Sequence, residues 1–346
     1  MTVFRGDDPA ALAAAAQRLA EGGLVAFPTE TVYGLGARAD SDAAVAGIFA
    51  AKGRPADHPL IVHVTDLAMA ESFAAELPPA ARRLAAAFWP GPVTLIVPRA
   101  PGMGAAAAGG QASIGLRCPA HPVAQALLRA AAQRGVPGVA APSANRFGRV
   151  SPTSAAHVAD EFGPALWVLD GGDCPLGIES TIIDLSCGRP ALLRPGVLTR
   201  SQLEAALGEP LHAADAQSPR ASGTLASHYA PAARVRLWPA DSLAAALADT
   251  RPTPARAARG SSPALSLYRP DIPPAGLAVY SRRAGSGAAG LVWRRMPDDP
   301  AAVAHELFAV LRQFDAHGVA DIWVELPPDD PAWEGVLDRL RRAAAA

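Results

Sequence analysis

Between residues 9 and 207, helical stretches alternate with short apolar strands, and this alternation predicts an α/β layer structure in which helices pack against a sheet. Helices are predicted at 9–21, 42–52, 79–89, 122–134 and 199–207. Strands are predicted at 24–27, 60–64, 93–97, 113–117, 138–141, 166–169, 181–185 and 191–194. The last two strands are close in sequence and suggest a hairpin, so we expect a mixed sheet rather than a purely parallel one.

A second α/β unit is predicted after residue 230. Periodicity is lost from 208 to about 227, where Ala, Gly, Ser and Pro dominate, as in a linker. Strands then recur at 235–238, 265–268, 277–280, 291–293 and 322–325, with helices near 241–248, 299–316 and 331–345. Residues 250–263 are expected to be a mobile loop. The predicted organisation is a first domain at 1–207, a linker at 208–230 and a smaller domain at 231–346.

Composition argues against several classes of protein. The net charge is −1, so we expect no whole-molecule basic field and no strong direct binding of nucleic acid. Cys118, Cys174 and Cys187 lack C-x-x-C spacing, which indicates neither a disulfide framework nor a zinc site and fits a reducing cytosol. The apolar stretch at 10–20 is interrupted by Gln17 and Arg18, so we expect a helix there and not a signal peptide. The sequence contains no run of about 18 strongly apolar residues, so we expect no membrane span.

Lys52 is the only lysine among 31 Lys and Arg residues. Lysine is a compact point charge whereas arginine is a planar fork, so a position that keeps lysine in an arginine-rich chain can indicate a phosphate site. The alternative is chance survival of one lysine. Lys52 and Arg54 also lie where a helix is expected to end, and the helix dipole favours cations there. The pair is therefore either a cationic helix end or a contact to a polyphosphate.

Polar loops after predicted strands give further candidates. The loop at 28–36 follows the first strand directly, where open α/β sheets place ligands. Its Gly-Leu-Gly sequence fits the dinucleotide fingerprint poorly, because six residues separate the strand from the first glycine. The loops at 141–145 and 177–181 offer hydroxyl and amide groups, and Arg117 and Arg194 close apolar strands. His63 lies inside an apolar strand, where a hydrogen-bonded core histidine is the usual outcome. Neither a Walker motif nor G-x-S-x-G is present, which argues against a P-loop and a serine hydrolase.

These segments, in this order, resemble the threonylcarbamoyl-AMP synthases in their two-domain form. The matching runs are FPTETVYGLG from Phe27, KGRP from Lys52, HPLIVHV from His58, FWPGPVTLIV from Phe88, SIGLRCP from Ser113, APSANRFGRVSPT from Ala141, GIESTIIDL from Gly177 and, in the linker, SHYAP from Ser227. The resemblance implies a YrdC-like twisted mixed sheet with helices and a smaller Rossmann-like α/β C-terminal domain.

The resemblance also implies a reaction. In this family, threonine and bicarbonate give N-carboxythreonine, which attacks the α-phosphate of ATP to form threonylcarbamoyl-AMP and pyrophosphate, a nucleotidyltransferase reaction. A partner transferase complex then moves the threonylcarbamoyl group to an adenosine beside the tRNA anticodon. Mg²⁺ is expected with ATP, bound through the phosphates and not directly by the protein.

Site residues carried over from the family form two groups. The expected ATP contacts are Lys52 and Arg54, which are also the expected catalytic residues, with His58, Ser113, Ser143, Asn145, Ser151, Arg194 and Tyr229. The expected threonine contacts are Thr31, His63, Arg117, the main chain of Ala141, and Ser180. His58 departs from the family, which often has asparagine there. Because Tyr229 lies in the linker, we hypothesise that the linker closes over the nucleotide as a lid.

Two alternatives belong to other classes. A carbamoyltransferase of the hydrogenase-maturation type shares the YrdC-like domain, but the acylphosphatase and zinc-finger regions of that family are not found in this sequence. The other alternative is an RNA-binding or regulatory module without catalysis. The near-neutral charge and the intact Lys52/Arg54 pair argue against it.

Overall fold

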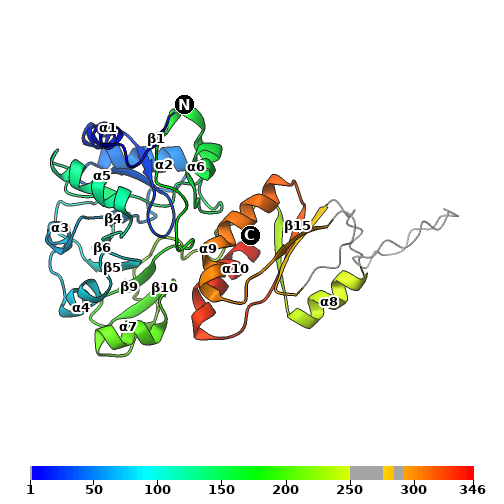
Figure 1. Cartoon of the computed structure of the whole chain (residues 1–346). Helices are drawn as coiled ribbons and strands as arrows, with labels where there is room; N and C mark the ends of the chain where they lie inside the picture. The colour runs from blue at the N-terminus through cyan, green and yellow to red at the C-terminus, as the bar shows by residue number, and fades with distance from the viewer. Residues whose placement is uncertain (1, 250–275, 284–290) are drawn as a thin grey trace.

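The computed structural model describes residues 2–249, 276–283 and 291–346, which form two sheets with helices packed around them (Figure 1). Within these residues the larger sheet has the strand order β1-β8-β2-β3-β7-β4-β6-β5-β9-β10-β11. Its strands are β1 Val3–Arg5, β2 Val25–Phe27, β3 Gly34–Arg38, β4 Ile61–His63, β5 Val93–Pro98, β6 Ser113–Arg117, β7 Val139–Ala140, β8 Trp167–Asp170, β9 Thr181–Asp184, β10 Ala191–Arg194 and β11 His212–Ala213. β4 pairs parallel with β6 and β9 pairs antiparallel with β10, which confirms the predicted mixed sheet and hairpin.

The helices of the larger unit are α1 Pro9–Ala20, α2 Asp42–Lys52, α3 Leu67–Glu71, α4 Pro79–Phe88, α5 Pro122–Ala132, α6 Ala155–Phe162 and α7 Arg200–Leu207. The five that were predicted, α1, α2, α4, α5 and α7, begin and end close to their predicted positions. Ser41 caps α2 by accepting the Ala44 N–H, and Gly53 ends it with a φ of 62°, a left-handed conformation that glycine adopts readily. Lys52 and Arg54 therefore do lie at a helix end.

The polar loop at 28–36 is shorter than predicted, because β3 begins at Gly34 and the Gly-Leu-Gly run is a strand. A Cβ atom at Gly36 would lie 2.8 Å from both Phe27 Cε1 and Val139 Cγ1, so glycine is needed for this packing. The elements β1, α3, α6 and β11 were not predicted, since most are too short to show a period.

The smaller sheet contains only parallel pairs among the described residues, as a Rossmann-like unit requires. Its order is β12-β15-β13-β14, from β12 Arg234–Trp238, β13 Leu277–Ser281, β14 Val292–Arg295 and β15 Asp321–Glu325. The helices are α8 Ala240–Asp249, α9 Pro300–Ala316 and α10 Glu334–Ala344, and a 3-10 turn at Pro331–Trp333 precedes α10. The predicted strand at 265–268 and loop at 250–263 lie outside the described residues.

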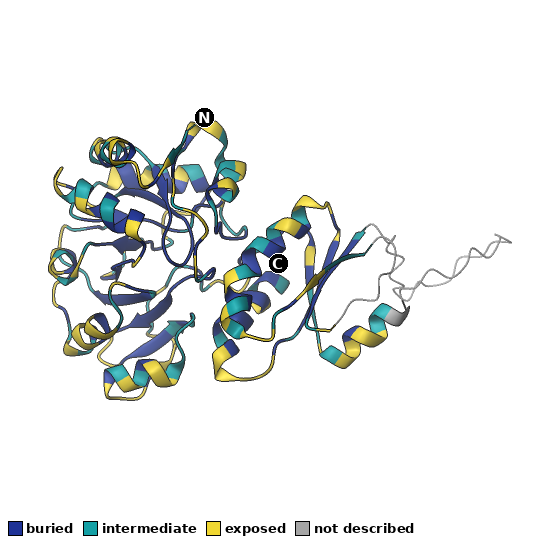
Figure 2. Ribbon diagram, viewed as in Figure 1, coloured by how far each residue is buried: buried dark blue, intermediate teal, exposed yellow. Residues whose placement is uncertain are grey.

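The two units are in contact through α9 and α10, which lie on the side of the smaller sheet that faces the larger unit (Figure 1). Strands of the larger sheet are mostly buried, whereas exposed residues lie on the outward faces of the helices (Figure 2). Among the described helices, none combines the length and apolarity that a membrane crossing needs.

One edge of the larger sheet gathers strand ends from distant parts of the chain. His63 lies opposite Arg117 where the parallel strands β4 and β6 end. β5 runs antiparallel to β6 and parallel to β9, so β9 starts at this edge with Thr181. β10 returns antiparallel to β9 and ends there at Arg194. Topology alone therefore brings the polar ends of four strands together, and the candidate site lies at this edge.

Candidate functional site

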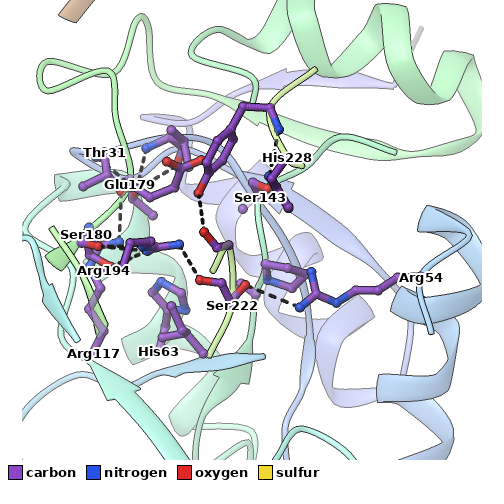
Figure 3. A pocket seen from close by; sticks show the side chains of 18 residues that line it. Thr31, Arg54, His63, Arg117, Ser143, Glu179, Ser180, Arg194, Ser222 and His228 are labelled. Atoms are coloured by element: carbon purple, nitrogen blue, oxygen red, sulfur yellow. Dashed lines mark hydrogen bonds between the residues drawn. The ribbon is translucent and has the colours of Figure 1, made fainter. Parts of the chain in front are cut away.

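A partly open pocket lies at this edge (Figure 3). Nine of the predicted contact residues line it, namely Thr31, Arg54, His63, Arg117, Ala141, Ser143, Ser180, Arg194 and Tyr229. Eight of them come from the larger unit, and Tyr229 comes from the linker. The structure thus brings together most of the residues that were predicted from separate motifs.

Five predicted contacts lie outside this lining. Lys52, Asn145 and Ser151 are buried behind it, with at most 2% of each residue exposed. His58 is half-buried, with its ring edge against Phe147 at a centroid distance of 5.3 Å. Ser113 lines a neighbouring cavity, which shares the walls formed by Ile61 and Ser222 with the first. Their ligand roles remain predictions.

Arg117 is held by a buried acidic partner that sequence reasoning did not assign. Its guanidinium donates to Glu30 Oε1 at 2.6 Å and to Thr31 Oγ1 at 2.9 Å. The second Glu30 oxygen accepts the Ala120 N–H at 2.9 Å, so both carboxylate oxygens are in use. Each terminal nitrogen of arginine carries two N–H groups, so Arg117 keeps donors for a ligand while Glu30 and Thr31 orient it.

Arg194 and Arg54 bring the linker to the pocket. Arg194 donates to the carbonyl oxygens of Ser180 and Ser222, both at 2.9 Å. Arg54 donates to the Pro59 carbonyl at 2.9 Å, and burial lowers the pKa of its guanidinium to about 10. Among the described residues, Arg54 Nε is buried and has no hydrogen-bond partner. A buried donor of this kind is expected to find its acceptor in a ligand or water.

Lys52 supports the loop after β7. Its Nζ donates to the Ser143 carbonyl at 2.5 Å and also to the Asn145 carbonyl. Burial, with a smaller contribution from the charge of Arg54, holds the pKa of Lys52 well below its usual range. The lone lysine therefore links the end of α2 to the main chain of the Ser143–Asn145 loop, and an ammonium or amine at this position orders that loop.

Two histidines in the pocket wall are neutral at physiological pH. Burial, and secondarily Arg117, lowers the pKa of His63 to about 3, and its Nδ1 has no partner among the described residues. Burial also lowers the pKa of His228 to about 3, and its Nδ1 accepts the Tyr229 N–H at 3.0 Å. His63 is thus a buried ring in the pocket wall whose Nδ1 has no hydrogen-bond partner among the described residues, so it is not the fully hydrogen-bonded core histidine that its strand position favoured.

The depressed pKa of His63 predicts a pH dependence of stability. Since its folded pKa lies below the unfolded value of about 6.5, the unfolded chain gains a proton first as pH falls. Stability from this residue is present above about pH 6.5 and is lost as pH falls toward 3. We expect His63→Gln to reduce the slope of the unfolding free energy by about 1.4 kcal/mol per pH unit between about pH 6 and 4, measured by urea denaturation. Equal slopes for wild type and His63→Gln would contradict the assignment.

The linker closes one side of the pocket through Ser222, Gly223, His228 and Tyr229. Tyr229 is 1% exposed, and its ring packs on Phe308 of α9 at a centroid distance of 5.3 Å. Its φ is 61°, and among the described residues it is the one non-glycine residue in a left-handed backbone conformation. This conformation costs free energy, which the surrounding packing must offset. Burial raises the pKa of the Tyr229 hydroxyl to about 12, so it stays protonated.

Within the larger unit and the linker, the sequence analysis did not assign five polar residues that line or support the pocket: Thr29, Glu30, Glu179, Ser222 and His228. All but Ser222 fall inside runs that carried the family resemblance, so the signal was present but no role followed from it. Ser222 lies in the aperiodic linker and gave no signal.

The fold and the site define a class of protein: an α/β protein with a pocket walled by three guanidinium groups, a kind of lining that suits anions, and bordered by an inter-domain linker. Known proteins identify the family within this class. A Sua5/YciO/YrdC family model described as telomere recombination matches residues 17–196, and a model described as the threonylcarbamoyl-AMP synthase C-terminal domain matches 198–345. The chain belongs to the threonylcarbamoyl-AMP synthase family.

Individual relatives match along nearly their whole length. A threonylcarbamoyl-AMP synthase of Pyrococcus abyssi is 38% identical, over 95% of this chain and 93% of that protein. The Bacillus subtilis threonylcarbamoyl-AMP synthase is also 38% identical, over 96% of this chain and 92% of that protein. The crystal structure of P. abyssi Sua5 complexed with L-threonine superposes with a TM-score of 0.80 at 34% identity, and covers 96% of this chain and 94% of that one. These findings favour neither alternative class considered from the sequence.

Proposed function

We propose that this protein is an L-threonylcarbamoyladenylate synthase, a nucleotidyltransferase that converts ATP, L-threonine and bicarbonate to threonylcarbamoyl-AMP and pyrophosphate. The observation that carries this proposal is the convergence of Arg54, Arg117 and Arg194 on one pocket in a member of this family. Phosphoryl chemistry depends mainly on positioning and charge neutralisation, which such a pocket supplies without a covalent intermediate.

The buried donors fit the two substrates. Arg117 and Thr31, next to each other in the wall, suit the carboxylate and the small side chain of an amino acid. The unpartnered Nε of Arg54 and the guanidinium of Arg194 suit phosphate oxygens. The neutral imidazole of His63 offers a hydrogen-bonding nitrogen without adding charge to the pocket.

The test is a pyrophosphate-release assay in which ATP, bicarbonate and threonine are omitted in turn. We expect release only when all three are present. Release without threonine or without bicarbonate would mean a different reaction, and replacing threonine with serine measures side-chain selectivity in the same assay.

Mg²⁺ is proposed to accompany ATP, bound through phosphate oxygens and water. Among the described residues that line the pocket, Glu179 carries the one carboxylate. Its two oxygens already accept hydrogen bonds from Ser151 and Arg339. No cluster of three or more metal-binding side chains occurs in the part of the chain that the structure describes. The ion would neutralise phosphate charge, while the arginines hold the phosphates in place.

The product is proposed to pass to a transferase complex that modifies the adenosine beside the tRNA anticodon. Threonylcarbamoyl-AMP is a mixed anhydride with a good leaving group, so a consuming acyl transfer is the chemistry expected next. We place this step in the cytosol, where the three free cysteines would stay reduced.

The linker at 208–230 is proposed to act as a lid. Because Ser222, Gly223, His228 and Tyr229 form part of the pocket wall, a bound nucleotide would contact the linker and slow its opening. We expect ATP with threonine to slow subtilisin cleavage between 208 and 228 severalfold, as followed by mass spectrometry. Unchanged cleavage across this segment would count against a lid.

A further inference from the structure

The smaller domain packs against residues 177–196, a segment of the larger unit that forms part of the pocket wall. A Cβ atom at Gly177 would lie 2.3 Å from the His305 carbonyl oxygen on α9, and one at Gly335 on α10 would lie 2.2 Å from the Gly196 carbonyl oxygen. Backbone therefore meets backbone at both ends of the segment 177–196. This segment carries the wall residues Glu179, Ser180 and Arg194, so α9 and α10 limit where those residues can lie.

Arg339 of α10 extends this contact into the pocket wall. It is fully buried, and its Nε donates to Glu179 Oε2 at 2.8 Å. A terminal nitrogen donates to the Glu179 carbonyl at 3.1 Å, and the other donates to the Pro195 carbonyl at 2.8 Å. The guanidinium also lies 5.4 Å from the ring centroid of Tyr229, within cation–π range. One side chain of the smaller domain thus holds two wall residues, Glu179 and Tyr229, without lining the pocket itself.

The charge of Glu179 is the reason this contact matters. A carboxylate in the wall of an anion pocket repels the ligand unless a cation compensates it. Burial alone would raise the pKa of Glu179, but Arg339 and Arg194 lower it, so the carboxylate stays ionised. Without Arg339, Glu179 would depend more on Arg194, the other arginine that lowers its pKa, and the pocket needs Arg194 for its ligand.

We propose that Arg339 is a positioning residue of the active site, which neutralises Glu179 from behind and thereby leaves Arg194 available to the phosphates of ATP. By this proposal, the smaller domain contributes a residue that ATP binding needs. The inference rests on the proposed function only through the identity of the anion, ATP.

The test compares ATP binding by isothermal calorimetry in full-length variants. Arg339→Met removes the buried cation, and we expect about a 10–100-fold weaker Kd for ATP, since an uncompensated buried charge costs several kcal/mol. Arg341→Met, an exposed change on the same helix that removes the same charge, should bind ATP within about twofold of wild type. The double variant Arg339→Met with Glu179→Gln should recover at least about tenfold of the lost affinity, because a neutral amide needs no compensating cation.

Each outcome either supports or overturns the proposed role of Arg339. Wild-type affinity in Arg339→Met overturns the inference, and so does a double variant no better than Arg339→Met, because a merely structural arginine would not be rescued by removing the opposite charge. If circular dichroism shows that Arg339→Met is unfolded, the test uses the double variant and Arg339→Lys, which keeps the charge. Weak ATP binding in both of these variants overturns the inference.

Wild type that binds ATP without threonine-dependent pyrophosphate release contradicts the proposed function but leaves this comparison intact. Wild type that does not bind ATP contradicts both.

Discussion

Lys52→Met is expected to lower kcat/KM for ATP by at least about a hundredfold, with a smaller effect on the fold. The change leaves the carbonyls of Ser143 and Asn145 without their donor, and each unsatisfied buried group costs about 1–3 kcal/mol. The loop that carries both residues would shift to regain hydrogen bonds with water. Pyrophosphate release measures the activity, and thermal unfolding measures the fold.

Lys52→Arg is the sharper version of the same test. The lysine is 2% exposed and its Nζ sits against two main-chain oxygens, so a planar guanidinium would have to displace the loop. We expect most activity to be lost although the positive charge is kept. An arginine variant that turns over normally would mean that the single lysine is a compositional accident and that the loop needs only a cation.

Arg117→Met is expected to give the largest loss of stability, about 3–5 kcal/mol in the free energy of unfolding, and to abolish measurable saturation by threonine. Removing one partner of a buried ion pair leaves the other charge unpaired, and here Glu30 is 8% exposed at its side chain. Urea denaturation gives the stability, and the dependence of pyrophosphate release on threonine gives the KM.

Two further variants separate the loss of the buried ion pair from the loss of the threonine contact. Arg82→Met breaks a surface pair with Glu71, in which each side chain is about half exposed, and should cost at most about 1 kcal/mol. Adding Glu30→Gln to Arg117→Met should restore much of the stability but not the threonine KM, because the ligand contact is still absent. Equal losses for Arg82→Met and Arg117→Met would contradict a buried, functional pair.

Most of the secondary structure followed from local chemistry. Caps and breakers such as Ser41 and Gly53 gave helix ends, and buried apolar runs gave most strands. Errors arose where the local signal was short or ambiguous. Gly34–Gly36 resembled a loop because glycine is common in turns, yet it is a strand because neighbouring rings and methyl groups leave room for no side chain.

The candidate site was predictable as a set of loops but not as a set of contacts. Runs rich in Thr, Ser, Gly and Arg marked the polypeptide that surrounds the pocket, because short polar side chains and free main-chain groups suit anions. The pairing of Arg117 with Glu30, and of Lys52 with two carbonyls, joins residues 87 to 93 positions apart. No local pattern specifies such partners.

The amino-acid sequence by itself determined the α/β class, the helix ends, the polar loops and the family resemblance, because each depends on residues within a few positions of one another. Only the tertiary structure decided which groups are buried together and in which charge state. Glu179 and Arg339 lie 160 positions apart and meet because α10 packs on the segment that bears Glu179. Strength of hydrogen bonds and shifts of pKa depend on burial and on nearby charges, and those exist only once distant strands and helices have packed.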